Sequence, residues 1–357
     1  MNSIQASELF ICGFDGQSLP GDVSSLLQTH TLGGLILFRR NIVDLEQVVD
    51  LNAQIINSNL DHPPLICVDQ EGGRVARLRG ISTDIPPLKQ LTSVLLNDPH
   101  LSFRLGAMMG RELVAMGFHL DFAPVCDIAL EQKDEDIVGD RSFSSDAKIV
   151  ATLTAQMIKG MQASGLAACA KHFPGHGATI KDSHFTLPYV TTKMNTLHER
   201  ELVPFKSAIK AQVASIMTAH LILHELDQKF PATMSEVVID QLLRKQLEFN
   251  NVVISDDLDM KAVADHYELR EIIEQSLMAS VDMFIIGNDW DKSQEAIRLT
   301  QELIDTNQHI FKKAVLAQER IKKLRTHYVG KALAPNQEYA RKIVRCPPHL
   351  DLMEALL

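Results

Sequence analysis

The 357-residue sequence has few cysteines, and the five that occur are odd in number and far apart. No Cys-x-x-Cys pair is present, and Cys12, Cys67, Cys126 and Cys169 each stand inside an apolar run. The odd number, the apolar surroundings and the lack of a Cys-x-x-Cys pair argue against a disulfide framework and against a cysteine-based zinc site. We therefore expect reduced, buried thiols.

Three further absences narrow the class of protein. No apolar run approaches the roughly 20 residues of a transmembrane helix, so we expect no membrane span. The N-terminus lacks a basic stretch and Glu8 interrupts its apolar segment, so we expect no signal peptide and a cytoplasmic location. The formal net charge is -10 without a long basic cluster, which argues against a nucleic-acid partner.

Short apolar runs recur along the chain with helical patterns between them. The runs cover residues 9–14, 33–38, 64–68, 118–125, 166–170, 215–219, 252–255 and 283–286. Continuous apolar strands that alternate with helices are typical of parallel sheets. We predict an α/β fold of the TIM-type (β/α)8 barrel class over residues 1–310, with a helical C-terminal extension over 311–357 that packs on the barrel. A doubly wound open sheet is the alternative.

A polar residue follows every predicted strand. These residues are Asp15, Arg39, Asp69, Asp121, Lys171, His220, Asp256 and Asn288. In a barrel the carboxyl ends of the strands meet on one face, which carries the active site. We therefore expect these side chains to converge.

The densest polar segment is Lys171–His184, which holds three histidines, one aspartate, one serine and two lysines. Its proline and glycines favour a loop that leaves a buried strand at Ala170. Asp182 and His184 stand two residues apart. A hydrogen bond between them would fix the imidazole tautomer and raise its pKa, which suits proton transfer near neutral pH.

Other interpretations of this segment remain open. It could be an ordinary polar loop, or His172, His176 and His184 could bind a metal ion, although their spacing matches no helical ligand motif. A nucleophilic Ser183 lacks the Gly-x-Ser-x-Gly elbow.

Asp256 and Asp257 end the seventh apolar run. Because side chains alternate along an extended segment, we expect only one of the two to point into the barrel mouth. The other would face a loop or cap a helix, and helix capping is the alternative role for either.

Four motifs carry a resemblance to a known family. They are Asp69-Gln-Glu-Gly-Gly-Arg-Val, Gly139-Asp-Arg-Ser-Phe, Lys171-His-Phe-Pro-Gly-His-Gly with Asp182-Ser-His, and Ser255-Asp-Asp-Leu-Asp-Met. In this order they resemble glycoside hydrolase family 3, and within it the β-N-acetylglucosaminidases that trim peptidoglycan fragments. The resemblance covers about residues 5 to 305. Ala178 departs from it, since some relatives have aspartate there.

The resemblance implies roles for individual residues. Asp256 matches the nucleophile, and His184 matches the acid/base with Asp182 as its partner. The residues that match those holding the terminal N-acetylglucosamine are Asp69, Arg77, Arg141, Lys171 and His172. Many members carry a second domain that supplies a carboxylate acid; here we expect the proton donor to come from the barrel. No metal or cofactor is implied.

The implied reaction is exo-acting, retaining hydrolysis of terminal N-acetylglucosamine from muropeptides through a glycosyl-aspartate. The expected partner is this small-molecule substrate, bound by a monomer. Three alternatives remain: a β-glucosidase, a phosphorylase of the same family, and a non-catalytic muropeptide-binding barrel.

Overall fold

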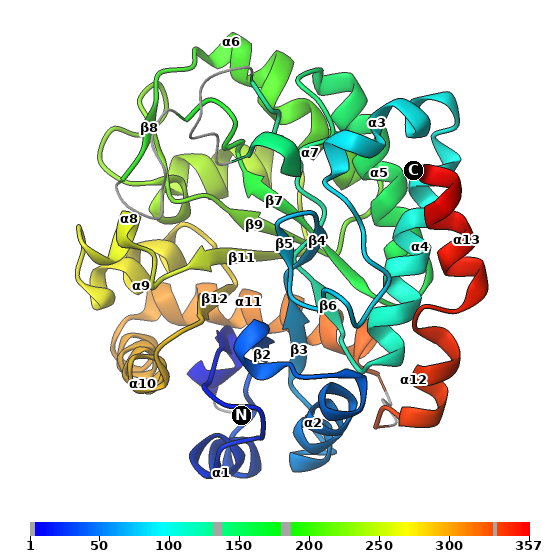
Figure 1. Cartoon of the computed structure of the whole chain (residues 1–357). Helices are drawn as coiled ribbons and strands as arrows, with labels where there is room; N and C mark the ends of the chain where they lie inside the picture. The colour runs from blue at the N-terminus through cyan, green and yellow to red at the C-terminus, as the bar shows by residue number, and fades with distance from the viewer. Residues whose placement is uncertain (1–3, 131–137, 180–186, 331–333) are drawn as a thin grey trace.

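The computed structural model describes residues 4–130, 138–179, 187–330 and 334–357. Among these residues, eight parallel strands close a barrel surrounded by helices (Figure 1), which confirms the predicted (β/α)8 class over the open sheet. The barrel order is β1-β12-β11-β9-β7-β6-β3-β2, and β2 pairs back with β1. The strands are β1 Phe10–Cys12, β2 Gly34–Leu37, β3 Leu65–Val68, β6 Leu120–Asp121, β7 Ala167–Phe173, β9 Ser215–Thr218, β11 Val252–Asp257 and β12 Met283–Ile286.

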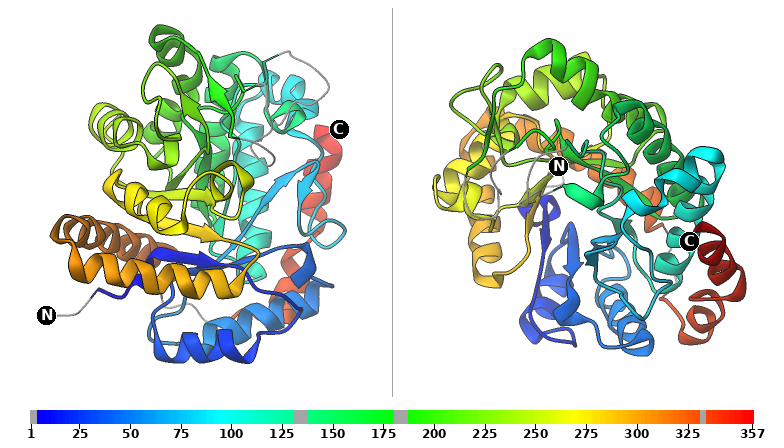
Figure 2. Two further views of the ribbon diagram at one scale, coloured as in Figure 1. Left: turned by 90° about the vertical axis from the view of Figure 1, so that its left-hand side faces the viewer. Right: turned by 45° about the horizontal axis from the view of Figure 1, so that its top comes forward.

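Helices connect consecutive strands along the outside of the barrel, as Figure 2 shows from two further directions. They are α1 Gly21–Thr29, α2 Leu45–Ser58, α3 Leu88–Asn97, α4 His100–Ala115, α5 Ala147–Ala163, α7 Leu202–Lys210, η6 Val237–Gln246, α9 Leu269–Met278 and α10 Trp290–Thr306. Shorter turns are η1 Ala6–Leu9, η2 Arg39–Asn41, η3 Gly139–Arg141, α6 Met194–Thr196, η4 Leu197–Glu201, η5 Ala232–Met234 and α8 Lys261–Ala264. In the described residues, no helix combines the length and the hydropathy needed to cross a membrane.

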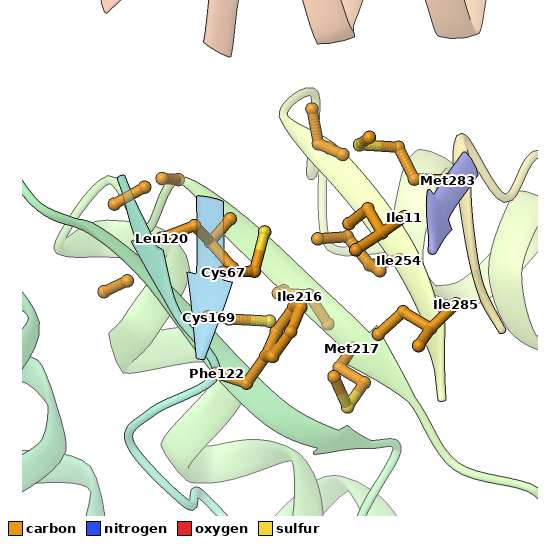
Figure 3. Close-up of a cluster of buried hydrophobic side chains, with 14 of the residues drawn as sticks. Ile11, Cys67, Leu120, Phe122, Cys169, Ile216, Met217, Ile254, Met283 and Ile285 are labelled. Carbon is orange, nitrogen blue, oxygen red and sulfur yellow. The ribbon is translucent and has the colours of Figure 1, made fainter. Parts of the chain in front are cut away.

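Apolar side chains from the strands fill the barrel (Figure 3). Ile11, Cys67, Leu120, Cys169 and Ile216 are all fully buried there. Burying a side chain of this size stabilises the fold by roughly 1.5–3 kcal/mol, which is why the strands read as continuous apolar runs. As predicted, the cysteines at positions 12, 67, 126 and 169 are buried and unpaired.

Side-chain caps define where several helices begin. The carboxylate of Asp44 accepts a hydrogen bond from the backbone N–H of Gln47 at 2.8 Å, as expected for the N-cap of α2. Asp146 caps α5 in the same way, accepting from Lys148 N at 2.7 Å. Both aspartates satisfy backbone donors that have no partner within the helix.

Two strands run further into polar sequence than predicted. The prediction that the chain leaves the fifth strand at Ala170 is wrong, because β7 continues to Phe173. The carbonyl of Lys171 accepts from Cys126 N at 2.7 Å, and the carbonyl of Phe173 accepts from Ala219 N at 2.8 Å. The strand β11 likewise extends to Asp257. These backbone bonds hold charged side chains at fixed positions instead of on a loop.

The C-terminal helices pack on the outside of the barrel, and α12 and α13 lie beside α4 in Figures 1 and 2. They are α11 Gln308–Tyr328, α12 Gln337–Ile343 and α13 Pro347–Leu356. The buried carboxylate of Glu112 in α4 accepts from His349 Nδ1 at 2.7 Å and from Arg345 N at 2.9 Å. The same carboxylate accepts from Thr83, so it connects the extension to the segment that precedes α3.

Candidate active site

A cavity of about 440 Å³ lies at the carboxyl ends of the barrel strands. Its apolar lining includes Ile36, Phe38, Phe122, Met217 and Ile285. Its polar lining includes Asp69, Glu71, Arg77, Arg141, Lys171, His172, His176, Asp256, Asp257, Asp259 and Asn288. A concave, partly apolar site with convergent charged groups is the expected form of a small-molecule site.

The residues after the barrel strands converge only in part. Of the eight predicted to meet, Asp69, Lys171, Asp256 and Asn288 line the cavity. The other four, Asp15, Arg39, Asp121 and His220, do not line it and have other partners. For example, Asp121 is buried and accepts from the backbone N–H of Gln70 at 2.9 Å.

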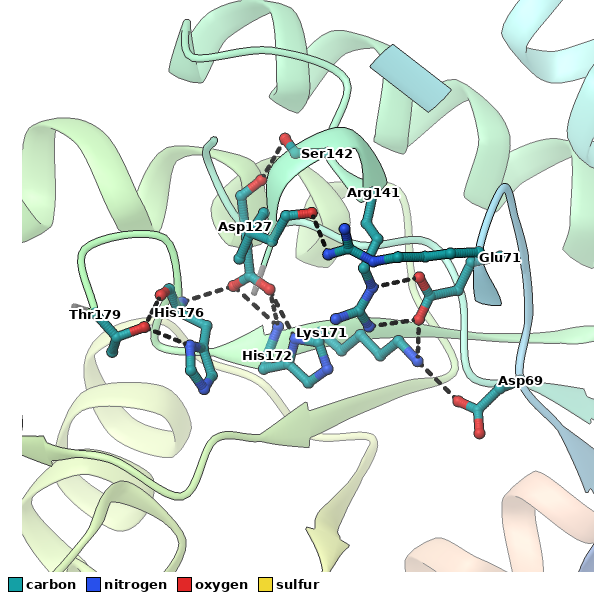
Figure 4. A network of polar contacts seen from close by, with 11 residues as sticks. Asp69, Glu71, Asp127, Arg141, Ser142, Lys171, His172, His176 and Thr179 are labelled. Carbon is teal, nitrogen blue, oxygen red and sulfur yellow. Dashed lines mark hydrogen bonds and ion pairs between the residues drawn. The ribbon is translucent and has the colours of Figure 1, made fainter. Parts of the chain in front are cut away.

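A network of ion pairs forms one wall of the cavity (Figure 4). Lys171 Nζ lies 2.8 Å from Asp69 Oδ1 and 2.7 Å from Glu71 Oε1. Arg141 contacts both oxygens of Glu71, with Nη2 at 2.6 Å and Nε at 2.8 Å. Arg77 Nη2 lies 3.5 Å from Asp69 Oδ2. Charged groups from three parts of the chain are thus fixed around one point.

Burial and charge act in opposite directions within this network. Burial alone would raise the pKa of Glu71, but Arg141 and Lys171 hold it well below its usual range. Burial alone would lower the pKa of Lys171, but Asp69 and Glu71 raise it. These groups are therefore charged at neutral pH, and their oxygens and N–H groups can meet the hydroxyl groups of a polar ligand.

A short antiparallel hairpin carries Glu71 into the cavity. Its strands are β4 Gln70–Gly72 and β5 Val75–Ala76. Gly72 and Gly73 have φ angles of +103° and +54°, a backbone conformation that residues with a side chain rarely adopt. A Cβ on Gly73 would also lie 2.9 Å from Pro87 Cα. The Gly-Gly pair of the motif therefore serves the turn and its close packing.

The breaks in strand pairing bring neighbouring side chains to the same cavity. Pairing of β7 with β9 shifts register between Ala170 and Phe173, and Lys171 and His172 both line the cavity. The peptide bond between Lys171 and His172 is cis, as is the bond before Pro174. The ring Nδ1 of His172 lies 2.7 Å from a carboxylate oxygen of the fully buried Asp127.

Asp256 and Asp257 also both line the cavity. Pairing of β11 with β12 shifts register between Ile254 and Asp257, which interrupts the alternation of side chains. The carboxylate of Asp257 also faces a loop, as expected for one of the pair, and accepts from Gly287 N at 3.2 Å and Asp259 N at 3.0 Å.

The two carboxylates differ in charge state. Burial alone would raise the pKa of Asp256, but the interactions with His172 and His220 outweigh it and lower the pKa. Burial raises the pKa of Asp257 to about 7, and the charges of Asp259 and Asp256 add to this effect. Asp256 is therefore ionised at neutral pH, while Asp257 keeps its proton to a higher pH than an ordinary aspartate does.

His220 holds the backbone beside Asp256. Its Nε2 lies 3.1 Å from the carbonyl oxygen of Asp257, which can only accept, so Nε2 donates. Its Nδ1 lies 2.8 Å from Thr233 Oγ1. Burial lowers the pKa of His220, while the charge of the neighbouring Asp256 acts in the opposite direction. The ring thus lies between Thr233 and the carbonyl of Asp257 and contacts both. This contact fixes the chain at the end of β11.

The structure brings six of the predicted site residues to one cavity: Asp69, Arg77, Arg141, Lys171, His172 and Asp256. Asp182 and His184 lie outside the described residues, so their roles stay predictions. Glu71 and Asp127 were not proposed as site residues. Glu71 stands inside the quoted motif, but nothing in the sequence marked Asp127, which follows an apolar segment.

Two of the three histidines in the alternative metal site have other hydrogen-bond partners. His172 Nδ1 contacts Asp127, and His176 Nδ1 lies 2.7 Å from Thr179 Oγ1. Burial lowers the pKa of His176 to about 4. Within the described ranges, no group of three or more histidine, cysteine or acidic side chains is arranged to hold a metal ion.

Comparison with known proteins shows extensive similarity. Residues 13–324 match the model of the glycosyl hydrolase family 3 N terminal domain. The sequence is 36% identical over 314 residues to a beta-hexosaminidase of Pasteurella multocida (strain Pm70), covering 87% of this chain and 86% of that protein.

Solved structures agree with this similarity. A glycoside hydrolase family 3 β-N-acetylglucosaminidase from Paenibacillus sp. str. FPU-7 superposes with a TM-score of 0.88 at 30% identity, covering 96% of this chain and 68% of that chain. Native NagZ from Neisseria gonorrhoeae superposes with a TM-score of 0.80 at 28% identity, covering 98% and 96%. NagZ has also been solved in complex with N-trifluoroacetyl-D-glucosamine.

Proposed function

The chain belongs to glycosyl hydrolase family 3, and we propose that it is an exo-acting, retaining β-N-acetylglucosaminidase that acts on peptidoglycan fragments. It is a glycoside hydrolase of the β-N-acetylhexosaminidase kind, the activity for which its curated relatives are named. The proposal adds the substrate, the stereochemistry and the residues that carry out the reaction.

One observation carries the proposal: an ionised carboxylate, Asp256, lines the same cavity as the ion-pair network of Lys171 and Glu71. A carboxylate kept ionised and partly desolvated is suited to attack an anomeric carbon. Asp256 Oδ1 accepts from Asp257 N at 2.8 Å, which orients the group. The other oxygen is the one that we assign to the attack.

The ion-pair network is suited to bind the hydroxyl groups of a terminal sugar. Asp69 and Glu71 offer acceptors, Lys171, Arg77 and Arg141 offer donors, and ion pairs link the five side chains. Because these charges already satisfy one another, a sugar hydroxyl can join the network without leaving an unpaired buried charge. The arrangement favours recognition of a neutral polyol, which agrees with a glycosidase.

The acid/base role is assigned to His184, with Asp182 as its partner, from the family resemblance. In the first step Asp256 attacks the anomeric carbon while His184 protonates the leaving oxygen, and a glycosyl-aspartate forms. In the second step His184 takes a proton from water, and the water oxygen bonds to the anomeric carbon as the bond to Asp256 breaks. The carboxylate of Asp256 is restored, and the sugar is released with its β configuration retained. The peptidoglycan fragment as substrate follows from the same resemblance.

The test is the rate of 4-nitrophenol release from the β-N-acetylglucosaminide and the β-glucoside, each with and without phosphate. We expect phosphate-independent release from the acetamido sugar, and its loss in Asp256→Asn. Faster release from the glucoside would indicate a β-glucosidase, and a phosphate requirement would indicate a phosphorylase. Binding of muropeptides without turnover would indicate a non-catalytic barrel and overturn the proposal.

A further inference from the structure

Asp127 accepts hydrogen bonds from the end of β7 and from the turn that follows it (Figure 4). It is fully buried and is not part of the cavity lining. Its Oδ1 accepts from His176 N at 2.7 Å, and its Oδ2 contacts the ring Nδ1 of His172 at 2.7 Å. The backbone N–H of His172 lies 3.1 Å and 3.2 Å from the two oxygens. Three nitrogens therefore converge on one carboxylate.

The protonation of Asp127 determines that of the His172 ring. Burial alone would raise the pKa of Asp127, but its interactions with His172 and His176 lower it below the usual range. An ionised carboxylate can only accept hydrogen bonds. The Nδ1 atom of His172 must therefore carry a proton, which leaves Nε2 as the ring nitrogen available to the cavity.

We propose that Asp127 is a positioning residue, which keeps the His172 imidazole protonated on Nδ1 so that Nε2 meets the bound sugar beside Asp256. This inference rests on the proposed function of the cavity and names a residue that acts through another. His172 is the first of the groups that offset the burial of Asp256, so its orientation bears on the nucleophile as well.

The surroundings of Asp127 leave little room for another arrangement. Its carbonyl oxygen accepts from Ser142 Oγ at 2.6 Å, which also fixes the segment that carries Arg141. A Cβ on Gly177 would lie 1.8 Å from the carbonyl oxygen of Ile128, so the turn after β7 packs directly on the backbone next to Asp127. Small shifts of either segment are therefore opposed.

Asparagine has the same size as aspartate at this position but a different hydrogen-bonding pattern. Its amide has one oxygen and one NH2 group. If the oxygen keeps the bond from His176 N, the NH2 group faces Nδ1 of His172, which must then accept. The proton would then have to lie on Nε2, so the ring nitrogen that meets the cavity would be held as a hydrogen-bond donor. Asp127→Asn is thus predicted to switch the tautomer without changing the volume of the side chain.

The experiment is nitrogen NMR of protein labelled in its histidine rings, with the His172 signals assigned by their loss in His172→Gln. In the wild type we expect a proton on Nδ1 of His172. In Asp127→Asn we expect the ring proton on Nε2, and a fall in kcat/KM on 4-nitrophenyl β-N-acetylglucosaminide of roughly 10- to 100-fold, the effect of a lost hydrogen bond to a charged group.

The matched control is Asp282→Asn. Asp282 is equally buried and accepts from Arg244 Nη2 at 2.5 Å and Arg320 Nη1 at 2.8 Å, outside the cavity. Both variants should lose stability, but Asp282→Asn should keep the His172 tautomer and kcat/KM within about twofold.

Three results would overturn the inference. They are a wild-type His172 with an unprotonated Nδ1, an unchanged tautomer in Asp127→Asn, and equal losses of kcat/KM in the two variants. The wild-type spectrum decides the matter even if Asp127→Asn does not fold. A wild type without activity on the sugar would contradict the proposed function, while the spectrum would still report on Asp127 and His172.

Discussion

Lys171 forms an ion pair with Glu71 at 2.7 Å in which both side chains are almost completely buried. Lys171 also pairs with Asp69, so one cation serves two carboxylates. Removing one member of a buried pair costs more than the pair itself contributes, because the partner is left as an uncompensated charge.

Lys171→Met should therefore lower the free energy of unfolding by about 3–5 kcal/mol, as well as abolish sugar binding. Urea unfolding measures the first effect and substrate saturation the second. The control is Lys342→Met, because Lys342 pairs with Glu338 on the surface of α12. It should have no measurable effect on stability. Similar stabilities for both variants would contradict the account of the network.

Asp257 should make stability depend on pH in an unusual direction. Its pKa is raised from 3.8 in the unfolded chain to about 7 in the folded protein. Between these values the unfolded chain has lost a proton that the folded protein keeps, so stability falls as the pH rises from 4 to 7. The full difference corresponds to at most about 4 kcal/mol.

Asp257→Asn should remove this dependence, because its amide does not titrate and its oxygen can still accept from Gly287 and Asp259. Unfolding free energies of the wild type and the variant are to be compared between pH 4 and pH 8. The gap between the two curves should change steadily across this range. Parallel curves would show that Asp257 does not retain its proton.

Glu112 should connect the C-terminal helices to the stability of the barrel. Its carboxylate accepts from Thr83, Arg345 and His349, and each donor would lose its partner in Glu112→Ala. We expect a loss of about 3 kcal/mol, as for several buried donors left unpaired. Thermal unfolding measures it.

The control for Glu112 is Glu46→Ala. Glu46 also joins the barrel helices to α12, through Arg341, but this ion pair is exposed. No measurable change is expected there. If Glu46→Ala lost as much stability as Glu112→Ala, the burial of Glu112 would not explain its contribution.

His184→Ala should discriminate between leaving groups. A general acid matters most when the leaving oxygen is a poor leaving group. We expect kcat to fall by roughly 10²–10⁴-fold on a disaccharide and far less on an activated aryl glycoside. Equal losses on both substrates would contradict the assignment of His184 as the acid, whatever the cause of the loss.

The barrel could be predicted because its strands are buried on both sides. Runs such as Gly33–Phe38 and Met283–Ile286 are apolar throughout, and the helices between them have capping residues such as Asp44. The strand ends were less predictable. The sequence predicted a loop at Lys171 and His172 because they are polar and stand shortly before a proline, yet both belong to β7. Partners distant in the sequence allow these polar residues to be buried.

The site could be predicted where a motif contains several polar residues. It could not be predicted where one buried residue outside the cavity acts through a neighbouring side chain. Asp69, Lys171 and Asp256 were found from their positions after apolar strands. Asp127 was missed because its importance comes from three nitrogens that β7 and its turn bring to it. These segments approach Asp127 only in the closed barrel. The sequence around Asp127 therefore contains no local pattern that predicts the contact.

The central claim is that Asp256 forms a covalent bond to the sugar. The most direct measurement is to inactivate the enzyme with a fluorinated N-acetylglucosaminyl fluoride, digest it and locate the added mass by mass spectrometry. We predict one added sugar on the peptide that contains Asp256, at its carboxylate, and no label in Asp256→Asn. A label on another residue, or turnover without any covalent sugar, would contradict the account.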